Sequence, residues 1–261
     1  MKNFNYHSTT NTKEAAKLVS GKGVFLAGGM TLLPAIKLRL AGYSALINIK
    51  KIKGLSGIKV SSKSLRIGAT TTHAEVAASK EVGKSIPSLA VLAEGIGDPQ
   101  VRNRGTIGGS IANNDPAADY PSACLALNAT IHTSKRKIPA DKLFKGMFET
   151  DLKRGELIES VEFEVPEKSA YAKFPNPASR YAVVGVYVAK LKKEARVAIT
   201  GVESFVFRCK KLEDALTSNF SPSAIDNVTI SSKGFNTDIH ASAEYRAHII
   251  KVMAKKAVSS C

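Results

Sequence analysis

The sequence predicts an α+β protein built from two packed units. Its 261 residues exceed the roughly 150 of one average domain, and a composition of 44% hydrophobic and 23% charged residues is typical of a soluble globular chain. The first 50 residues alternate between strand and helix patterns. From about residue 168 the pattern changes to apolar, β-branched runs followed by a helical end, which predicts a separate α+β unit.

The N-terminal unit is expected to begin as a small α/β motif. Short apolar patterns predict strands at residues 3–7, 24–27 and 45–49. Asn11 followed by Glu14 is typical of a helix N-cap. A second helix is expected over residues 33–42, with Pro34 in the first turn, where its missing N–H costs little.

The rest of this unit has shorter elements. A loose segment at residues 50–59 is expected to separate two sub-domains, and residues 58–60 and 64–68 alternate as the strands of a hairpin do. Helices are predicted over residues 73–79 and 87–94. Gly95 to Pro121 is so rich in Gly, Asn, Asp and Pro that it is expected to be a long, functional loop.

The C-terminal unit is predicted to be an antiparallel meander followed by helix. Strand patterns occupy residues 181–189, 197–202 and 205–207. Near the end, Ile249, Val252, Met253 and Ala257 recur at helical spacing and predict one apolar helix face.

Charge and cysteine usage exclude several classes of protein. The formal net charge is +16, but the lysines are dispersed, so a solvated surface is expected rather than a nucleic-acid site. Cys124, Cys209 and Cys261 are too distant to predict a disulfide framework or a metal site. No secretory signal or membrane-spanning stretch is found, which favours a cytoplasmic protein.

Two glycine pairs are the first candidate sites. Residues 25–31, Phe-Leu-Ala-Gly-Gly-Met-Thr, pass from a strand through Gly28 and Gly29 into a helix start. Glycine allows close backbone approach and a helix N-terminus attracts phosphate, with Thr31 able to cap the helix or donate to a phosphate oxygen. An ordinary turn would explain the same residues.

The second glycine pair lies in a polar stretch, residues 102–121, that also holds two arginines, several amides and two carboxylates. Two backbone nests with cations nearby suit a pyrophosphate. Asp119 is suited to bind sugar hydroxyls or, equally, to cap a helix at Tyr120, and Asp115 has the same local explanation. The spacing matches neither the GxGxxG nor the GxxxxGK[ST] pattern, so neither a Rossmann fold nor a P-loop is predicted.

Five segments together resemble one family. They are AGGMTLLPAIKLR (27–39), QVRNRGTIGGSIANNDPAADYPSACLALNA (100–129), GMFETDLKRGELIESVEFEVP (146–166), KFPNPASRYAVVGVYVA (173–189) and DIHASAEYRAHII (238–250). In this order they resemble the FAD-binding medium subunits of the xanthine dehydrogenase and aerobic carbon monoxide dehydrogenase family. The resemblance implies an FAD-binding domain of the p-cresol methylhydroxylase (PCMH) type at residues 1–167, with sub-domains at about 1–54 and 55–167. A carbon monoxide dehydrogenase flavoprotein C-terminal domain is implied at residues 168–261.

The resemblance also implies FAD as cofactor and a set of contacts. The segment matching Leu26, Ala27, Gly28, Gly29, Met30 and Thr31 wraps the FAD pyrophosphate in the family, although His and Ser are frequent where Met30 and Thr31 stand here. Thr106, Ile107, Gly108, Gly109 and Ser110 match a segment that lies along the cofactor. Asp119 matches the acid that binds its hydroxyls, and Leu157 matches a backbone contact near the flavin ring. Lys173 matches a cation near the flavin N1 and C2 carbonyl, or is one more surface lysine.

No nucleophile and base stand out in the sequence, so no catalytic residue and no metal ligand is predicted on this chain. In the resembling enzymes substrate is hydroxylated on a large molybdopterin-binding subunit, and electrons pass through a small subunit with two [2Fe-2S] clusters to FAD. A dimer of heterotrimers is therefore expected, cytoplasmic or held at the inner membrane by its partners, with part of the positive charge used at the FAD diphosphate and in docking. The subfamily resembling 4-hydroxybenzoyl-CoA reductase is excluded, because its additional cluster needs four cysteines.

Two alternatives remain open at this point. A stand-alone flavoenzyme of the same fold, resembling UDP-N-acetylenolpyruvylglucosamine reductase, would need its own proton donor and an NADPH site. A basic binding protein without enzymatic activity would use the glycine loops only as structure.

Overall fold

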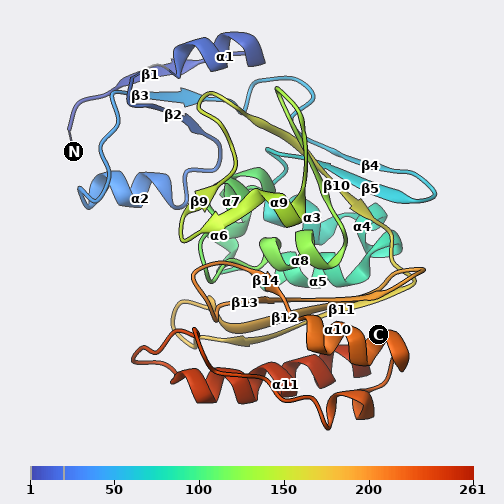
Figure 1. Cartoon of the computed structure of the whole chain (residues 1–261). Helices are drawn as coiled ribbons and strands as arrows, with labels where there is room; N and C mark the ends of the chain where they lie inside the picture. The colour runs from blue at the N-terminus through green and yellow to red at the C-terminus, as the bar shows by residue number, and fades with distance from the viewer. Residues whose placement is uncertain (1, 20) are drawn as a thin grey trace.

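The computed structural model describes residues 2–19 and 21–261, so Met1 and Ser20 lie outside the described part of the chain. Figure 1 shows the elements stacked in layers, from a small N-terminal sheet to a C-terminal helix at the opposite end. Four sheets are present among the described residues, with three, five, four and two strands. No helix of the described part is long and apolar enough to cross a membrane.

The first layer is a three-stranded parallel sheet with the order β1-β3-β2. Its elements are β1 (Asn5–Ser8), α1 (Thr12–Leu18), β2 (Gly23–Leu26), α2 (Leu32–Lys37) and β3 (Ala45–Asn48), which confirms the predicted alternation. The side chain of Asn11 accepts from the N–H groups of Lys13 and Glu14, so the predicted cap is present. The Glu14 carboxylate accepts from the Thr9 hydroxyl rather than from the cap residue.

The second sheet is antiparallel and has the order β4-β5-β10-β6-β7. Its strands are β4 (Ile58–Val60), β5 (Ser64–Gly68), β6 (Thr130–Thr133), β7 (Lys137–Pro139) and β10 (Ile158–Glu164). The helices beside it are α3 (His73–Ala78), α4 (Lys80–Ser85), α5 (Pro87–Glu94) and α9 (Ala140–Leu143), and a small hairpin joins β8 (Phe144–Gly146) to β9 (Glu149–Thr150). The hairpin of β4 and β5 and two of the helices confirm the sequence prediction, whereas α4 was not predicted.

The prediction of a long irregular loop from Gly95 to Pro121 is wrong. This segment forms α6 (Pro99–Arg104), α7 (Ile107–Asn113) and the first turn of α8 (Tyr120–Ala126). The side chains of Asp98 and Thr106 cap the first two helices. Gly108 of α7 is needed for packing, because a Cβ there would lie 2.6 Å from the Cβ of Ala69. Tertiary contact therefore overrides the poor helix propensity of glycine.

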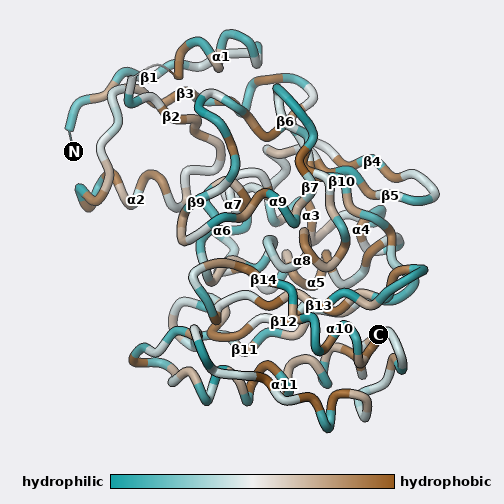
Figure 2. Tube along the Cα trace, in the orientation of Figure 1, coloured by the Kyte–Doolittle hydropathy of each residue, from teal (hydrophilic) through white to brown (hydrophobic). Residues whose placement is uncertain are grey.

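The third sheet is antiparallel and sequential, with the strands β11 (Lys168–Pro175), β12 (Ala182–Lys190), β13 (Ala195–Thr200) and β14 (Phe207–Arg208). It is followed by α10 (Lys210–Ser218), the 3-10 turn η1 (Pro222–Ile225) and α11 (Ala243–Ser259). Tyr187 faces the inner helices, whereas Val186 and Val188 face α11. Both faces are covered, which explains the continuous apolar run of β12. Figure 2 shows hydrophobic stretches along these layers and along α11.

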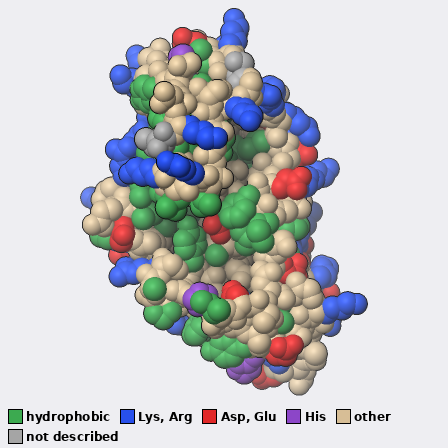
Figure 3. Space-filling model, turned by 90° about the vertical axis from the view of Figure 1, so that its left-hand side faces the viewer, with side chains coloured by type: hydrophobic (Ala, Val, Ile, Leu, Met, Phe, Trp, Pro, Cys, Tyr) green, Lys and Arg blue, Asp and Glu red, His purple; other side chains and the backbone are tan. Residues whose placement is uncertain are grey.

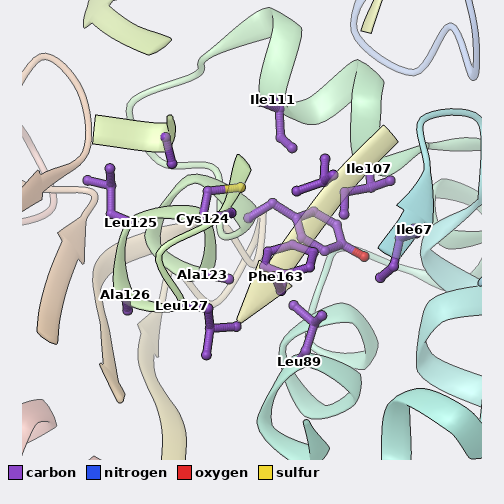
Figure 4. Close-up of a cluster of buried hydrophobic side chains, with 14 of the residues drawn as sticks. Ile67, Leu89, Ile107, Ile111, Ala123, Cys124, Leu125, Ala126, Leu127 and Phe163 are labelled. Carbon is purple, nitrogen blue, oxygen red and sulfur yellow. The ribbon is translucent and has the colours of Figure 1, made fainter. Parts of the chain in front are cut away.

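The largest core cluster lies between the five-stranded sheet, the inner helices and one face of the third sheet. Figure 4 shows Ile107 and Ile111 of α7 and Leu125 of α8 gathered with Phe163 of β10. All four side chains are buried. This packing fixes α7 and α8, and with them the glycine pair and Asp119.

Candidate functional site

The turn between β2 and α2 presents unused backbone donors. The N–H groups of Gly28, Gly29, Met30 and Thr31 make no hydrogen bond to any residue that the structure describes. Gly29 has a φ of +76°, a conformation that L side chains rarely adopt. Thr31 occupies the N-cap of α2 without a side-chain cap bond, so its hydroxyl is free. Adjacent free donors of this kind form a concave anion-binding nest.

The two glycine segments lie against each other although nearly 80 residues separate them in sequence. A Cβ on Gly28 would overlap the carbonyl oxygen of Arg104 and lie 2.8 Å from the Cα of Gly105. This close backbone approach requires glycine at position 28. The loop before α7 therefore forms one wall beside the free N–H groups.

The second glycine segment differs from the expected second nest. The N–H of Ile107 donates to Thr71, that of Gly108 to Ala69, and that of Gly109 to the side chain of Thr106. These donors at the start of α7 are therefore already used inside the protein. Gly109 is half-buried, and a Cβ there would meet only the Thr106 hydroxyl within 4 Å, so the segment offers a bare surface instead of free donors.

Asp119 does not cap α8, because its side chain makes no cap hydrogen bond. Its carboxylate instead accepts from the Tyr171 hydroxyl and, at 2.9 Å, from the Lys173 ammonium, both on β11. The Asp119 side chain is 5% exposed and that of Lys173 is 11% exposed. Burial raises the pKa of Asp119, and Lys173 and Tyr171 oppose that rise. Asp115, in contrast, accepts from the N–H of Ala117 within a turn and caps none of the described helices.

Three cations converge on the carbonyl groups of residues 95–97. The Lys173 ammonium lies 2.9 Å from the Gly95 oxygen, and Arg102 lies 3.1 Å from the oxygens of both Ile96 and Gly97. Arg180, which has a φ of +60°, reaches the Gly97 oxygen at 3.3 Å. The Lys173 ammonium is therefore held by two acceptors, the Gly95 carbonyl and the Asp119 carboxylate, and its side chain is largely buried. The interpretation of Lys173 as one more surface lysine is wrong.

Leu157 lies near the first glycine segment through its side chain. It is buried in the N-terminal cluster against which Ala27 also packs. Its N–H donates to the Ser134 hydroxyl at 3.1 Å, and its carbonyl accepts from the Ser134 N–H at 2.8 Å. These two hydrogen bonds anchor the start of β10 to Ser134.

His73 is a buried neutral residue behind the site. Its ring lies 5.3 Å from that of Tyr120, and its backbone N–H donates to Gly105. Burial, with a smaller contribution from Arg102, lowers its pKa from 6.5 to about 4. The histidine therefore supports the loop before α7 as an uncharged side chain.

Acid should destabilise the protein through His73. The unfolded state binds a proton below about pH 6.5 whereas the folded state resists until about pH 4, so stability falls as pH falls through that window. The loss is about 3 kcal/mol, at roughly 1.36 kcal/mol for each pKa unit. We expect His73→Leu to flatten this part of the pH profile of urea unfolding. An unchanged slope relative to wild type would contradict the assignment.

The structure thus brings together most of the residues singled out in the sequence. Gly28 lies against Gly105, just before α7, and Lys173 is paired with Asp119. Leu157 belongs to the cluster on which Ala27 packs. Figure 3 shows one side of the molecule, where a hollow between the upper and lower parts is bordered by apolar side chains and Lys and Arg gather above it. Tyr171 and the Gly95 carbonyl were not predicted. Tyr171 lies two residues before Lys173 on the same strand face, which is the only signal that the sequence carried.

The chain is similar in sequence and in structure to known proteins of one family. Residues 2–167 match the family described as FAD binding domain in molybdopterin dehydrogenase. The chain is 34% identical to the glyceraldehyde dehydrogenase medium chain of Sulfolobus acidocaldarius, covering 97% of this chain and 96% of that one. It is 33% identical to the carbon monoxide dehydrogenase medium chain of Hydrogenophaga pseudoflava, covering 98% and 96%. Its structure matches the reconstituted CO dehydrogenase from Oligotropha carboxidovorans with a TM-score of 0.91 at 27% identity, covering 99% and 97%.

The chain therefore belongs to the family of FAD-binding medium subunits of molybdopterin-dependent dehydrogenases. This confirms the resemblance, the α+β fold with its FAD-binding domain, and FAD as the cofactor. The free donors of residues 28–31 fit such a cofactor, because a diphosphate needs N–H groups that the protein leaves unpaired. The relatives support neither a stand-alone reductase nor a basic binding protein.

Proposed function

We propose that this chain is the FAD-binding electron-transfer subunit of a molybdenum hydroxylase complex, similar to the medium subunit of aerobic carbon monoxide dehydrogenase. The observation that carries the proposal is the run of four unpaired N–H groups at residues 28–31, set against Gly105. The chain also holds a buried carboxylate, Asp119, paired with its own cation, Lys173. A diphosphate and a set of hydroxyls need donors and an acceptor of these kinds.

The proposed contacts follow from the chemistry of each segment. The N–H groups of Gly28, Gly29, Met30 and Thr31 bind the pyrophosphate, with the Thr31 hydroxyl as an additional donor. Leu26 and Ala27 lead into that turn from β2. Among residues 106–110, Gly109 and Ser110 are the half-buried ones, and the missing side chain of Gly109 allows the cofactor to lie close to α7.

Asp119, Leu157 and Lys173 complete the proposed site. The Asp119 carboxylate accepts from the hydroxyl groups of the cofactor, and the backbone of Leu157 makes a contact near the flavin ring, while its side chain is buried in the N-terminal cluster. The Lys173 ammonium provides positive charge beside the flavin N1 and C2 carbonyl. When bound, FAD accepts electrons singly or in pairs, and this chain binds, orients and electrostatically tunes it.

The partners that we propose are a large molybdopterin-binding subunit and a small subunit with two [2Fe-2S] clusters, in a dimer of heterotrimers. The relatives support a multi-subunit assembly, since two of them are named as medium chains. We propose a cytoplasmic complex in which any contact with the inner membrane is made by the partners, and a domain boundary between residues 167 and 168, where β11 begins. Part of the net charge of +16 would then serve docking to more acidic subunits.

The test is to purify the full chain and measure its flavin content. We expect a yellow protein that binds FAD, shows no NADPH oxidation alone, and passes electrons to an external acceptor only after the cluster-bearing and molybdopterin-binding subunits are added. A colourless, folded protein that cannot be loaded with FAD would contradict the proposal. Turnover of NADPH by the isolated chain would favour the stand-alone reductase instead.

A further inference from the structure

One face of β11 carries a row of three polar side chains directed at the inner helices. Ser169, Tyr171 and Lys173 alternate with Ala170 and Ala172, which pack toward α11. The hydroxyl of Ser169 lies 2.6 Å from that of Ser88 on α5. The next two members of the row both reach Asp119. The third sheet therefore makes polar contact with the FAD-binding part of the chain along a single line.

The two donors of this row occupy different oxygens of Asp119. The Tyr171 hydroxyl donates to Oδ1 and the Lys173 ammonium donates to Oδ2. An ionised carboxylate has about four lone-pair sites, so two are left for other donors. The carboxylate is thus fixed in orientation and still has acceptor capacity for a pair of hydroxyl groups.

The ring of Tyr171 is itself held in a shaped space. It stacks on Tyr187 with ring centroids 5.8 Å apart. On the neighbouring strand, Gly185 has no side chain at the point where the Tyr171 hydroxyl sits, and a Cβ there would lie 3.1 Å from Cζ and overlap the hydroxyl oxygen. A Cβ on Gly185 would also lie 2.7 Å from Cγ2 of Thr200 on β13. Gly185 is buried in the middle of β12, where glycine weakens a strand, so its presence is explained by the close approach of both Tyr171 and Thr200.

We propose that Tyr171, with the space provided by Gly185, is a positioning residue that orients the Asp119 carboxylate toward the hydroxyl groups of FAD. This inference rests on the proposed role of Asp119 in cofactor binding. It assigns the C-terminal unit a part in forming the FAD site, since the positioning hydroxyl and the paired ammonium both come from β11. A phenol that donates to a carboxylate also favours the ionised form, which is the form that accepts cofactor hydroxyls.

The test compares two hydroxyl deletions in the same aromatic stack of the full chain. Tyr171→Phe keeps the ring and removes the donor to Asp119, and we expect FAD affinity to fall about tenfold at neutral pH, the effect of one hydrogen bond to a charged group. We also expect the acid limit of FAD binding to move to higher pH, because Asp119 becomes easier to protonate. Tyr187→Phe is the matched control: its hydroxyl bonds Ser88, at 2.6 Å, and not Asp119, so affinity and pH profile should stay as in wild type.

Asp119→Asn separates this inference from the proposal beneath it. If Asp119→Asn weakens FAD binding and Tyr171→Phe behaves like Tyr187→Phe, the positioning role is overturned and the role of Asp119 stands. If neither variant changes FAD affinity, the role of Asp119 itself is wrong. Should Tyr171→Phe not fold, Gly185→Ala displaces the hydroxyl while keeping it in the chain. The same shift of the acid limit is then expected, and its absence in a folded Gly185→Ala protein overturns the inference.

Discussion

Asp119→Ala is expected to yield a protein that loses FAD on gel filtration and unfolds more easily. The substitution removes the acceptor that we propose for cofactor hydroxyls and leaves the Lys173 ammonium, 11% exposed, without its counter-ion. Removing one partner of a buried ion pair costs about 3 kcal/mol. The flavin-to-protein absorbance ratio and urea unfolding of the apoprotein measure the two effects separately.

Asp115→Ala is the matched control for this substitution. Asp115 lies in the same segment, but within the described part of the chain its carboxylate accepts only from the nearby N–H of Ala117. We expect this variant to keep its FAD and to lose less stability than Asp119→Ala. Equal FAD retention by the two variants would rule out Asp119 as a cofactor ligand.

Gly28→Ala should separate the two glycine segments. The added Cβ meets the backbone of Arg104 and Gly105, which cannot swing aside as the end of a side chain can. Overpacking of this kind costs about 1–3 kcal/mol. Because the turn must move to relieve the overlap, the four free N–H groups no longer align on one anion, and FAD affinity should fall by more than tenfold. Titration of the apoprotein with FAD and thermal unfolding provide the two readouts.

Gly83→Ala is a control glycine substitution that is expected to raise stability rather than lower it. Gly83 lies within α4, and a Cβ there would meet nothing within 4 Å. Alanine in a helix interior is favoured over glycine by up to about 1 kcal/mol, so this variant should be at least as stable as wild type and bind FAD normally. If Gly28→Ala matched it in both measurements, the close approach of the two segments would have no bearing on the cofactor.

The sequence predicted elements best where one short pattern decides them. The N-terminal alternation, the cap at Asn11 and the run of β12 depend on neighbours within a few residues, and all three are present. The segment from Gly95 to Pro121 was mistaken for a loop because its helices depend on distant partners. Gly108 lowers helix propensity locally, yet it lets α7 pack against Ala69.

The candidate site was also predicted only in part, because some of its contacts depend on residues far apart in the sequence. Glycine pairs and an isolated aspartate are visible in a linear motif, and family resemblance related them to FAD. The donors of Asp119 lie 52 and 54 residues further along the chain, and no local pattern relates them to it. The use of the N–H groups at the start of α7 by Ala69 and Thr71 was equally hidden, since those residues precede the segment by more than 30 positions.

The contact between β11 and Asp119 also determines when, during synthesis, Asp119 can acquire its two hydrogen-bond donors. During synthesis the ribosome releases Asp119 well before Tyr171 and Lys173, and β11 is itself completed only by pairing with β12. A nascent FAD-binding part that ends before residue 168 therefore carries an Asp119 carboxylate with neither of its two donors. The Asp119 carboxylate can therefore take its fixed orientation only after β11 has been made and has paired with β12.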